Sequence, residues 1–138
     1  MKRMFLVLSV MGLFLTLCVG AFYSKAQSEQ VKGAMSGCEE QCVRCQTTCE
    51  KATAYIKKAG GKTASSQRLA LLADCIAMCK TSAGFLGRDS QFHPKVCKLC
   101  ADVCASCAKS CEELNDPKLK DCVEECKKCT ESCNRMAE

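Results

Sequence analysis

Cysteine is the residue through which this sequence can do chemistry, and the clearest pattern lies between His93 and Leu114. Five cysteines recur there at steps of three and four residues: Cys97, Cys100, Cys104, Cys107 and Cys111. Such steps match the turn of an α-helix, so these side chains share one face, and His93, four residues before Cys97, lies on the same face. Because thiolates act as nucleophiles and as ligands of soft metals, this stripe is a candidate for either chemistry.

The other cysteines repeat this spacing in three further segments. Residues 28–59 carry Cys38, Cys42, Cys45 and Cys49, residues 67–86 carry Cys75 and Cys79, and the segment from residue 117 carries Cys122, Cys126, Cys129 and Cys133. Each set falls on the inward stripe of a predicted helix. The chain has 16 cysteines, no tryptophan and 5% aromatic residues in 138 residues. We therefore expect one domain whose core is not an aromatic one.

The N-terminus is predicted to be an export signal, residues 1–26, which leaves residues 27–138 as a single mature domain. Two basic residues precede an apolar run over residues 4–19, and small residues at Ser24 and Ala26 favour cleavage after Ala26. The alternative is an uncleaved membrane anchor, for which the run is rather short. The protein is therefore expected to be exported, to a periplasmic or other extracytoplasmic location.

Charge indicates neither nucleic acid nor an anionic membrane as a partner. The chain has 20 basic and 15 acidic residues, a formal charge of +5. Three of the basic residues lie in the predicted signal: Lys2, Arg3 and Lys25. Their removal leaves a formal charge of +2 and no long basic run. The large Leu17 before Cys18 also argues against a lipid-modified cysteine, so we expect no stable membrane association.

Packing and disulfides are the ordinary explanations for so many cysteines in an exported domain. Cys18 lies in the predicted signal, so the mature domain has fifteen cysteines. A free thiol packs as a small hydrophobe, but leucine would bury more apolar area at about 25 cal/mol per Å², so packing does not explain all fifteen. Exported cysteine-rich domains usually carry disulfides. However, fifteen is odd, and cysteines four apart on one helix have Cβ atoms about 5–6 Å apart, beyond the roughly 3.5–4.5 Å of a disulfide. Bridges between facing helices remain open.

Metal binding is the third explanation, and the spacing favours Cu(I). Zinc sites typically take four ligands from two knuckles shaped by loops, and iron–sulfur ligands usually lie on loops that wrap a cluster. Here the cysteines lie on straight helices. Two thiolates one turn apart suit a soft ion that is content with two ligands, as Cu(I) is. A tube of such pairs would hold multiple Cu(I) ions per chain, screened from water and oxygen.

The elements that position these thiols are four predicted helices. They cover residues 28–59, 67–86, about 91–114, and 117 to near the C-terminus. Gly60 and Gly61 end the first, Ser65 or Ser66 caps the second, and Asp116 caps the fourth. Short connections favour an all-α fold, an antiparallel up-down-up-down four-helix bundle with a cysteine-lined core.

The second helix differs from the others because it is apolar nearly all round. It carries only two cysteines, and Leu, Ala, Ile and Met occupy most other positions of residues 69–78. One small bundle cannot bury such a helix fully. We therefore expect its outer face to pack on another protomer of a homo-oligomer.

Laying the helices antiparallel gives the core two different ends. The end that we call the leucine plug gathers Ile56, Leu69, Leu72, Leu114 and Leu119, and the end that we call the mouth gathers Met35, Leu86, His93 and Met136. The inward stripe of the first helix is expected to begin at Val31, before Met35. We expect the plug to be dry, and His93, Met35 and Met136 to be candidate ligands at the mouth, beside the fifteen cysteines.

Several stretches resemble the cysteine-rich four-helix-bundle copper storage proteins of bacteria. They are Leu72-Ala73-Asp74-Cys75-Ile76-Ala77-Met78-Cys79, Arg88-Asp89-Ser90-Gln91-Phe92-His93, the series from Cys97 to Cys111, and the run Cys126-x-x-Cys129-x-x-x-Cys133. The similarity covers essentially the whole chain after the signal. It implies a homotetramer of bundles, each storing many Cu(I) ions through pairs of thiolates, with Met and His near the open end. Members often begin the last helix with a His-Cys pair, where this chain has Lys118 and Leu119, which implies one fewer site near the plug.

The resulting hypothesis is a binding protein that stores Cu(I) for copper-accepting enzymes or chaperones. The single histidine lacks a nucleophile, base and orienting group, and thiols saturated with metal are poor nucleophiles, so no enzyme is expected. Two alternatives remain. The same sites would serve detoxification of copper or another soft metal, and a disulfide-stapled structural or redox protein would use the cysteines without metal.

Overall fold

The computed structural model describes residues 2–137, with side chains from Lys25 onward. This part of the chain is helical without any strand. Its elements are α1 (Lys2–Ala59), the 3₁₀ turn η1 (Gly61–Ala64), α2 (Ser66–Gly87), α3 (His93–Glu112), η2 (Pro117–Leu119) and α4 (Lys120–Met136). The chain divides into two units, of which the first ends at Gly33 and contains the first part of α1. The second unit begins at Ala34 and contains the bundle.

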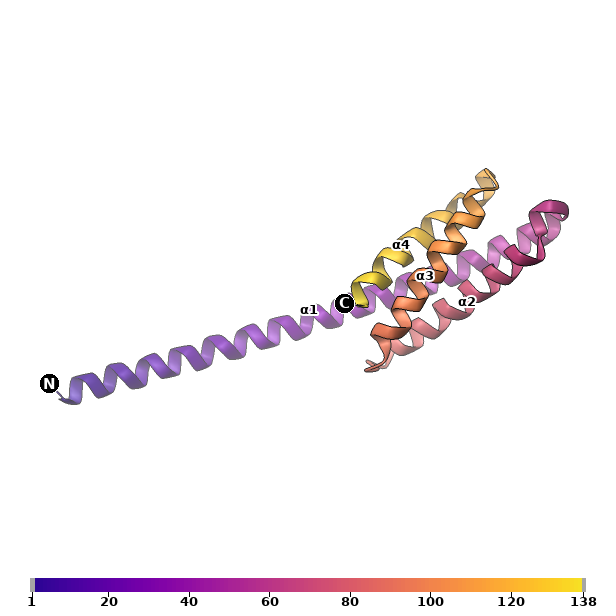
Figure 1. The fold of residues 1–138 in the computed structure, drawn as a ribbon. Coiled ribbons are helices and arrows are strands. Elements are labelled where there is room, and N and C mark those ends of the chain that lie inside the picture. The colour runs from indigo at the N-terminus through magenta and orange to yellow at the C-terminus, as the bar shows by residue number, and fades with distance from the viewer. Residues whose placement is uncertain (1, 138) are drawn as a thin grey trace. The chain divides into compact units, whose positions relative to one another are not determined.

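In the second unit, the rest of α1 runs beside α2, α3 and α4 (Figure 1). Successive helices reverse direction across short connections, and α3 packs between α2 and α4. Sulfur contacts join α1 to both of its neighbours, through Cys45 and Cys126 of α4 and through Cys49 and Cys75 of α2. The predicted antiparallel four-helix bundle is confirmed.

The helix ends follow the predicted local signals, with three exceptions. One is the fourth helix, which was predicted to begin at about Pro117 with Asp116 as its cap but begins at Lys120, because Asp116 caps the 3₁₀ turn η2. Gly60 and Gly61 have φ angles of 68° and 59°, in the left-handed region that glycine adopts at helix ends, and the Ser65 hydroxyl caps α2 by accepting from the amide of Arg68. Ser28 does not begin a helix, because α1 is continuous from Lys2 and no proline interrupts it. α3 ends at Glu112, two residues earlier than predicted.

The leucine plug is formed at the end where α1 meets the α3–α4 connection. Ile56, Leu72 and Leu119 are almost completely buried, but Leu69 and Leu114 are only partly buried against the core. At the same end of the bundle, the Tyr55 hydroxyl donates to the Asp116 carboxylate at 2.5 Å. Lys118 lies over the Tyr55 ring, with its ammonium 5.5 Å from the centroid.

The mouth lies at the opposite end, and its residues are less evenly buried. Met35 and Leu86 belong to the core, whereas His93 and Met136 are half-buried. The prediction for Val31 is wrong: its side chain is 52% exposed. Val31 belongs to the first unit of the chain, so the buried stripe of α1 begins one turn later, at Met35.

The outer surface of α2 is only in part the apolar one that was predicted, because Asp74, Lys80 and Thr81 are exposed on it. Ala70, Ala73 and Ala77 are exposed, as is Gly84. Among the residues searched, α2 is the one helix long and apolar enough to span a membrane, with a mean hydropathy of 1.5 and 28% of that window buried. Length and composition alone give this result, which core helices also reach.

Candidate metal centre

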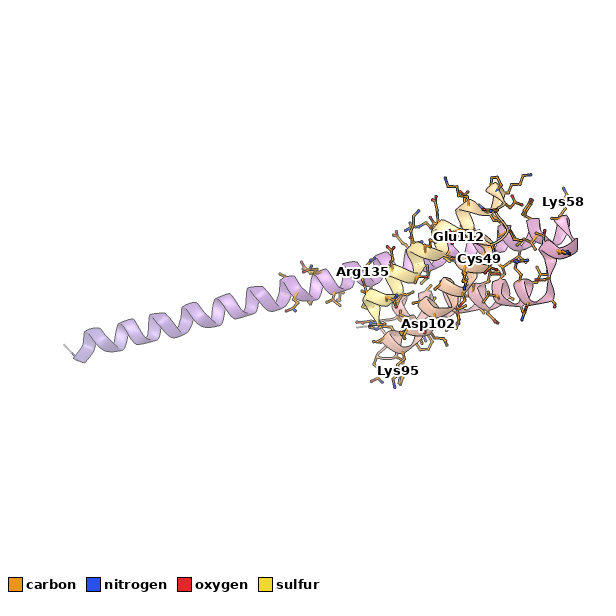
Figure 2. All side chains as sticks on the ribbon, turned by 45° about the horizontal axis from the view of Figure 1, so that its top comes forward. Cys49, Lys58, Lys95, Asp102, Glu112 and Arg135 are labelled. Carbon is orange, nitrogen blue, oxygen red and sulfur yellow. The ribbon has the colours of Figure 1, made fainter. Side chains whose placement is uncertain are left out.

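The bundle axis is lined with free, buried thiols. All fifteen cysteines from Cys38 to Cys133 are unbridged, and none is more than 2% exposed. In Figure 2, Cys49 lies between the helices, while Lys58 and Lys95 project outward from the bundle. Every cysteine that was predicted to lie on an inward stripe therefore does so. Their role as ligands remains a prediction.

The sulfur atoms form contacts across all four helices. Cys49 of α1 lies 3.7 Å from Cys75, 3.8 Å from Cys122 and 3.5 Å from Cys126, measured between Sγ atoms. Near the middle of the bundle, the Cys104 sulfur of α3 is 3.6 Å from those of both Cys75 and Cys79. The thiols are therefore one connected network rather than isolated pairs.

Within this network, sets of four sulfurs lie within 4.8 Å of one another. Ordered along the axis from the mouth, five of these four-thiol groups are Cys42–Cys100–Cys129–Cys133, Cys79–Cys100–Cys104–Cys129, Cys45–Cys75–Cys79–Cys104, Cys45–Cys49–Cys75–Cys126 and Cys49–Cys107–Cys122–Cys126. Each group shares two thiols with the next. Each group also draws on at least three helices, so the intact bundle is needed to assemble it.

The sulfur separations suit a metal ion better than a covalent bridge. The contacts range from 3.5 Å (Cys49–Cys126) to 4.0 Å (Cys111–Cys122), well beyond the roughly 2.05 Å of an S–S bond. A metal–thiolate bond is about 2.3 Å long for zinc. Two bonds of about that length span roughly 3.8–4.0 Å at angles of about 110–120° and 4.6 Å when linear. The thiols are therefore close to bridging distance before any ion binds.

The thiols hold their protons in shared hydrogen bonds. The pKa of Cys104 is raised mainly by its hydrogen bond with Cys100, and the pKa of Cys126 is raised mainly by its hydrogen bond with Cys107. Burial raises both pKa values further. A hydrogen bond with Cys100 is the largest of several that lower the pKa of Cys129. Since ligation requires the thiolate, metal binding must release protons from this network.

The mouth brings some of the predicted additional ligands to the core. The Nδ1–H of His93 donates to the Ser90 carbonyl at 2.8 Å, because a carbonyl can only accept, and this leaves the Nε2 lone pair available. Met136 and Cys38 line a pocket of about 420 Å³ between α1 and α4. His93 and Met35 are not among the residues that line this pocket, so the three predicted extra ligands do not converge on one cavity.

A sequence model of the copper storage protein family matches residues 24–138. The chain belongs to this family. The matched range includes the whole bundle, so the resemblance seen in the sequence is confirmed.

Relatives with known structures have the same fold. The Nmul_A1745 protein of Nitrosospira multiformis is 37% identical, with a TM-score of 0.72 over 76% of this chain and 95% of that one. The Cu(I)-bound copper storage protein BsCsp3 is 26% identical, with a TM-score of 0.72 over 76% of this chain and 99% of that one. Among curated sequences, the uncharacterised cysteine-rich protein YhjQ of Bacillus subtilis is 27% identical over 87 residues, 63% of this chain and 81% of its own length.

The copper storage fold of this chain also buries polar groups that the sequence reasoning missed. Ser82 is completely buried, and its hydroxyl has no hydrogen-bond partner among the described residues. It follows Cys79 by three residues, so helical spacing could have placed it on the thiol stripe. Gln41 donates to the Glu125 carboxylate at 2.8 Å. No local sequence pattern predicts that contact, because it joins residues of α1 and α4.

Proposed function

We propose that this protein stores several Cu(I) ions on the thiolates of its bundle core and releases them to copper-accepting enzymes or chaperones. The observation that carries this proposal is the row of four-thiol groups, each sharing two sulfurs with the next. A single structural metal would need only one such group. A continuous row provides capacity instead.

Ligand chemistry supports Cu(I) as the cargo. The five groups contain only cysteine, and thiolate-only sites favour Cu(I), zinc or iron–sulfur clusters among common metals. The net charge left in the core favours many monovalent ions over a few divalent ones. Each zinc ion held by four unshared thiolates would leave two buried negative charges, whereas one Cu(I) per thiolate leaves the core neutral. Because buried net charge is costly, loading should proceed towards roughly one ion per thiol.

Membership of the family supports a storage role rather than catalysis, as does the absence of a reacting constellation among the side chains described from Lys25 onward. The fifteen thiols are buried, and the Nδ1 of His93 is engaged with the Ser90 carbonyl. Sequestration of toxic copper would use the same sites and differs from storage only in whether the ions are later released.

We also propose that the mature protein is exported and forms a homo-oligomer through α2. The export signal is supported by the sequence of residues 1–26, whose apolar run has side chains outside the described part of the chain. The oligomer is supported by the exposed small residues of α2, which allow close approach of a second helix.

Titration of reduced, oxygen-free mature protein with Cu(I) in competition with a strong chelator tests the storage function. We expect uptake of roughly half to one ion per core thiol, since the groups share ligands, and loss of nearly all free thiols to titration with a thiol reagent. A parallel zinc titration gives the metal preference.

Two results would contradict storage of copper. One is saturation at one or two ions per chain, and the other is tighter binding of zinc than of Cu(I). Isolation of the protein from its compartment with most thiols oxidised would instead favour the disulfide alternative.

A further inference from the structure

The pocket between α1 and α4 combines a thiol of the core with an excess of positive charge. Cys38 and Met136 line it together with Arg44, Lys128 and Arg135, and one carboxylate, that of Glu131. Its volume of about 420 Å³ is within the range of small-molecule sites. It therefore offers a space of ligand size beside the outermost sulfur of α1.

A second pocket reaches the opposite end of the thiol network and has the opposite charge. It measures about 260 Å³ and is lined by Cys111 with Glu112, Asp116 and Lys120, so that acidic groups exceed basic ones. The positive excess is thus a property of the pocket at Cys38 and does not simply accompany every opening near a cysteine.

The side chains of the first pocket are partly committed and partly available. Lys128 binds Glu125 at 2.7 Å. Arg44 donates to the Gln41 side-chain oxygen at 3.0 Å and also pairs with Glu40 at 3.7 Å and Glu125 at 3.9 Å. Arg135 makes no ion pair with any residue between 25 and 137. An uncommitted guanidinium at a pocket rim is suited to a carboxylate, which it can bind through two parallel hydrogen bonds.

From this combination we infer that the pocket is a docking site for a small anionic Cu(I)–thiolate complex whose thiols carry carboxylates, and that Cys38 is the first sulfur to receive its copper. This inference depends on the proposed storage function and adds to it the class of copper donor and the place of transfer.

The transfer is a ligand exchange in which copper remains Cu(I) throughout. The Cys38 thiol gives up its proton, a Cu–S bond forms to Sγ, and one Cu–S bond of the donor breaks as its thiolate takes a proton and leaves as thiol. A second exchange passes the ion to Cys133, 3.8 Å from Cys38, and releases the second donor thiol. Cys133 belongs to the first four-thiol group together with Cys42, 3.6 Å away, so the ion has then reached the row.

Two Cu(I) donors with the same sulfur coordination and opposite charge test this inference. The anionic donor is Cu(I) with excess 3-mercaptopropionate, and the cationic donor is Cu(I) with excess cysteamine. Transfer to the reduced mature protein is followed by stopped-flow absorbance at low ionic strength, with K128E/R135E as the variant. K120E at the Cys111 pocket is the matched control.

We expect K128E/R135E to slow transfer from the anionic donor by about tenfold or more, as electrostatic steering does, and this effect to shrink at 1 M salt. Transfer from the cationic donor should be unchanged or faster, final capacity should be unchanged, and K120E should behave as the wild type. C38S should slow transfer from both donors.

The inference is overturned if the charge reversal slows both donors equally, slows neither, or acts no more strongly than K120E. These outcomes differ from failure of the storage function, in which the wild type would take up no more than one or two ions from either donor. Helical circular dichroism and equal capacity of the variant exclude misfolding as the cause of a slower rate.

Discussion

Ser82 of α2 carries the one buried side-chain oxygen without a hydrogen-bond partner in the described part of the chain. A buried hydroxyl without a hydrogen bond costs about 1–3 kcal/mol. The position follows the spacing of the α2 cysteines, so its burial was predictable from sequence, whereas the missing partner was not.

Replacing Ser82 with alanine should therefore stabilise the metal-free protein. We expect S82A to raise the free energy of unfolding by about 1–3 kcal/mol, measured by urea denaturation of the reduced protein at neutral pH. S132A, at the other buried serine, is the control, and it should have a smaller effect. A loss of stability in S82A would mean that the hydroxyl does have a partner in solution.

The cysteines and the mouth residues show what residue patterns can and cannot predict. Steps of three and four placed all fifteen thiols correctly, because helical periodicity alone decides which face a residue occupies. The same rule misplaced Val31, since periodicity does not say where along a helix the other helices stop. The antiparallel arrangement placed His93 and Met136 at the same end of the bundle, but it did not indicate that Met136 lines the pocket at Cys38 and His93 does not.

Among the elements, α1 and α4 are tied by a polar contact at the level of the thiols. Gln41 of α1 donates to the carboxylate of Glu125 on α4, and Lys128 donates to the same carboxylate at 2.7 Å. Lys128 and then Gln41 stabilise the ionised form, so the pKa of Glu125 lies below its ordinary value. A contact of this kind depends on two helices meeting, and neither helix alone predicts it.

The sign of this pKa shift sets the pH at which the contact matters. A depressed pKa in the folded state stabilises the protein above the unfolded value of about 4.3, and the benefit is lost as pH falls through the folded value. We expect E125Q to be less stable than the wild type by about 0.5–1 kcal/mol at pH 7, with the difference vanishing near pH 3. Urea denaturation of the reduced protein at both pH values measures this.

Glu131 on the same helix provides the comparison for Glu125. Its exposed carboxylate makes no ion pair with the described residues, so E131Q should leave stability unchanged at both pH values. An E125Q deficit that persists unchanged at pH 3 would show that the side chain acts through packing rather than charge.

The connections between elements were largely predictable because turn chemistry is local. Gly60 and Gly61 adopt the positive φ angles that end α1, and Asp116 caps the following 3₁₀ turn by accepting from Lys118 at 2.9 Å. The exception is the end of α3, where Asn115 takes a φ of 50°. Asparagine tolerates that conformation, and the chain leaves the helix before Leu114 can join the buried plug.

For the whole molecule, the outer face of α2 is the surface that most needs a partner. Ala70, Ala73, Ala77 and Gly84 are exposed on it beside the polar Asp74 and Lys80, and these small residues would allow a second helix to approach the backbone closely. We expect A77R, at the centre of this face, to shift the oligomer to smaller species in sedimentation velocity or light scattering. The reason is that a long side chain there would keep the second helix away from the small residues of this face.

The control for A77R is a substitution of similar size on an exposed face outside α2. Ala105 of α3 is exposed, and A105R should leave the oligomeric state unchanged. If both variants keep the wild-type mass, α2 is not the interface. If the wild type is itself monomeric at micromolar concentration, the homo-oligomer proposal is wrong.

The sharing of two sulfurs between successive four-thiol groups gives the core a property that separate binding sites would lack. An ion that moves from one group to the next exchanges two ligands and keeps the other two, so it is never without sulfur along the row from Cys42 to Cys122. We therefore expect Cu(I) ions to pass along the bundle axis from one group to the next. Ions taken up at one end can redistribute inside the protein without passing through water, and the order in which they arrive does not decide which of them is released first.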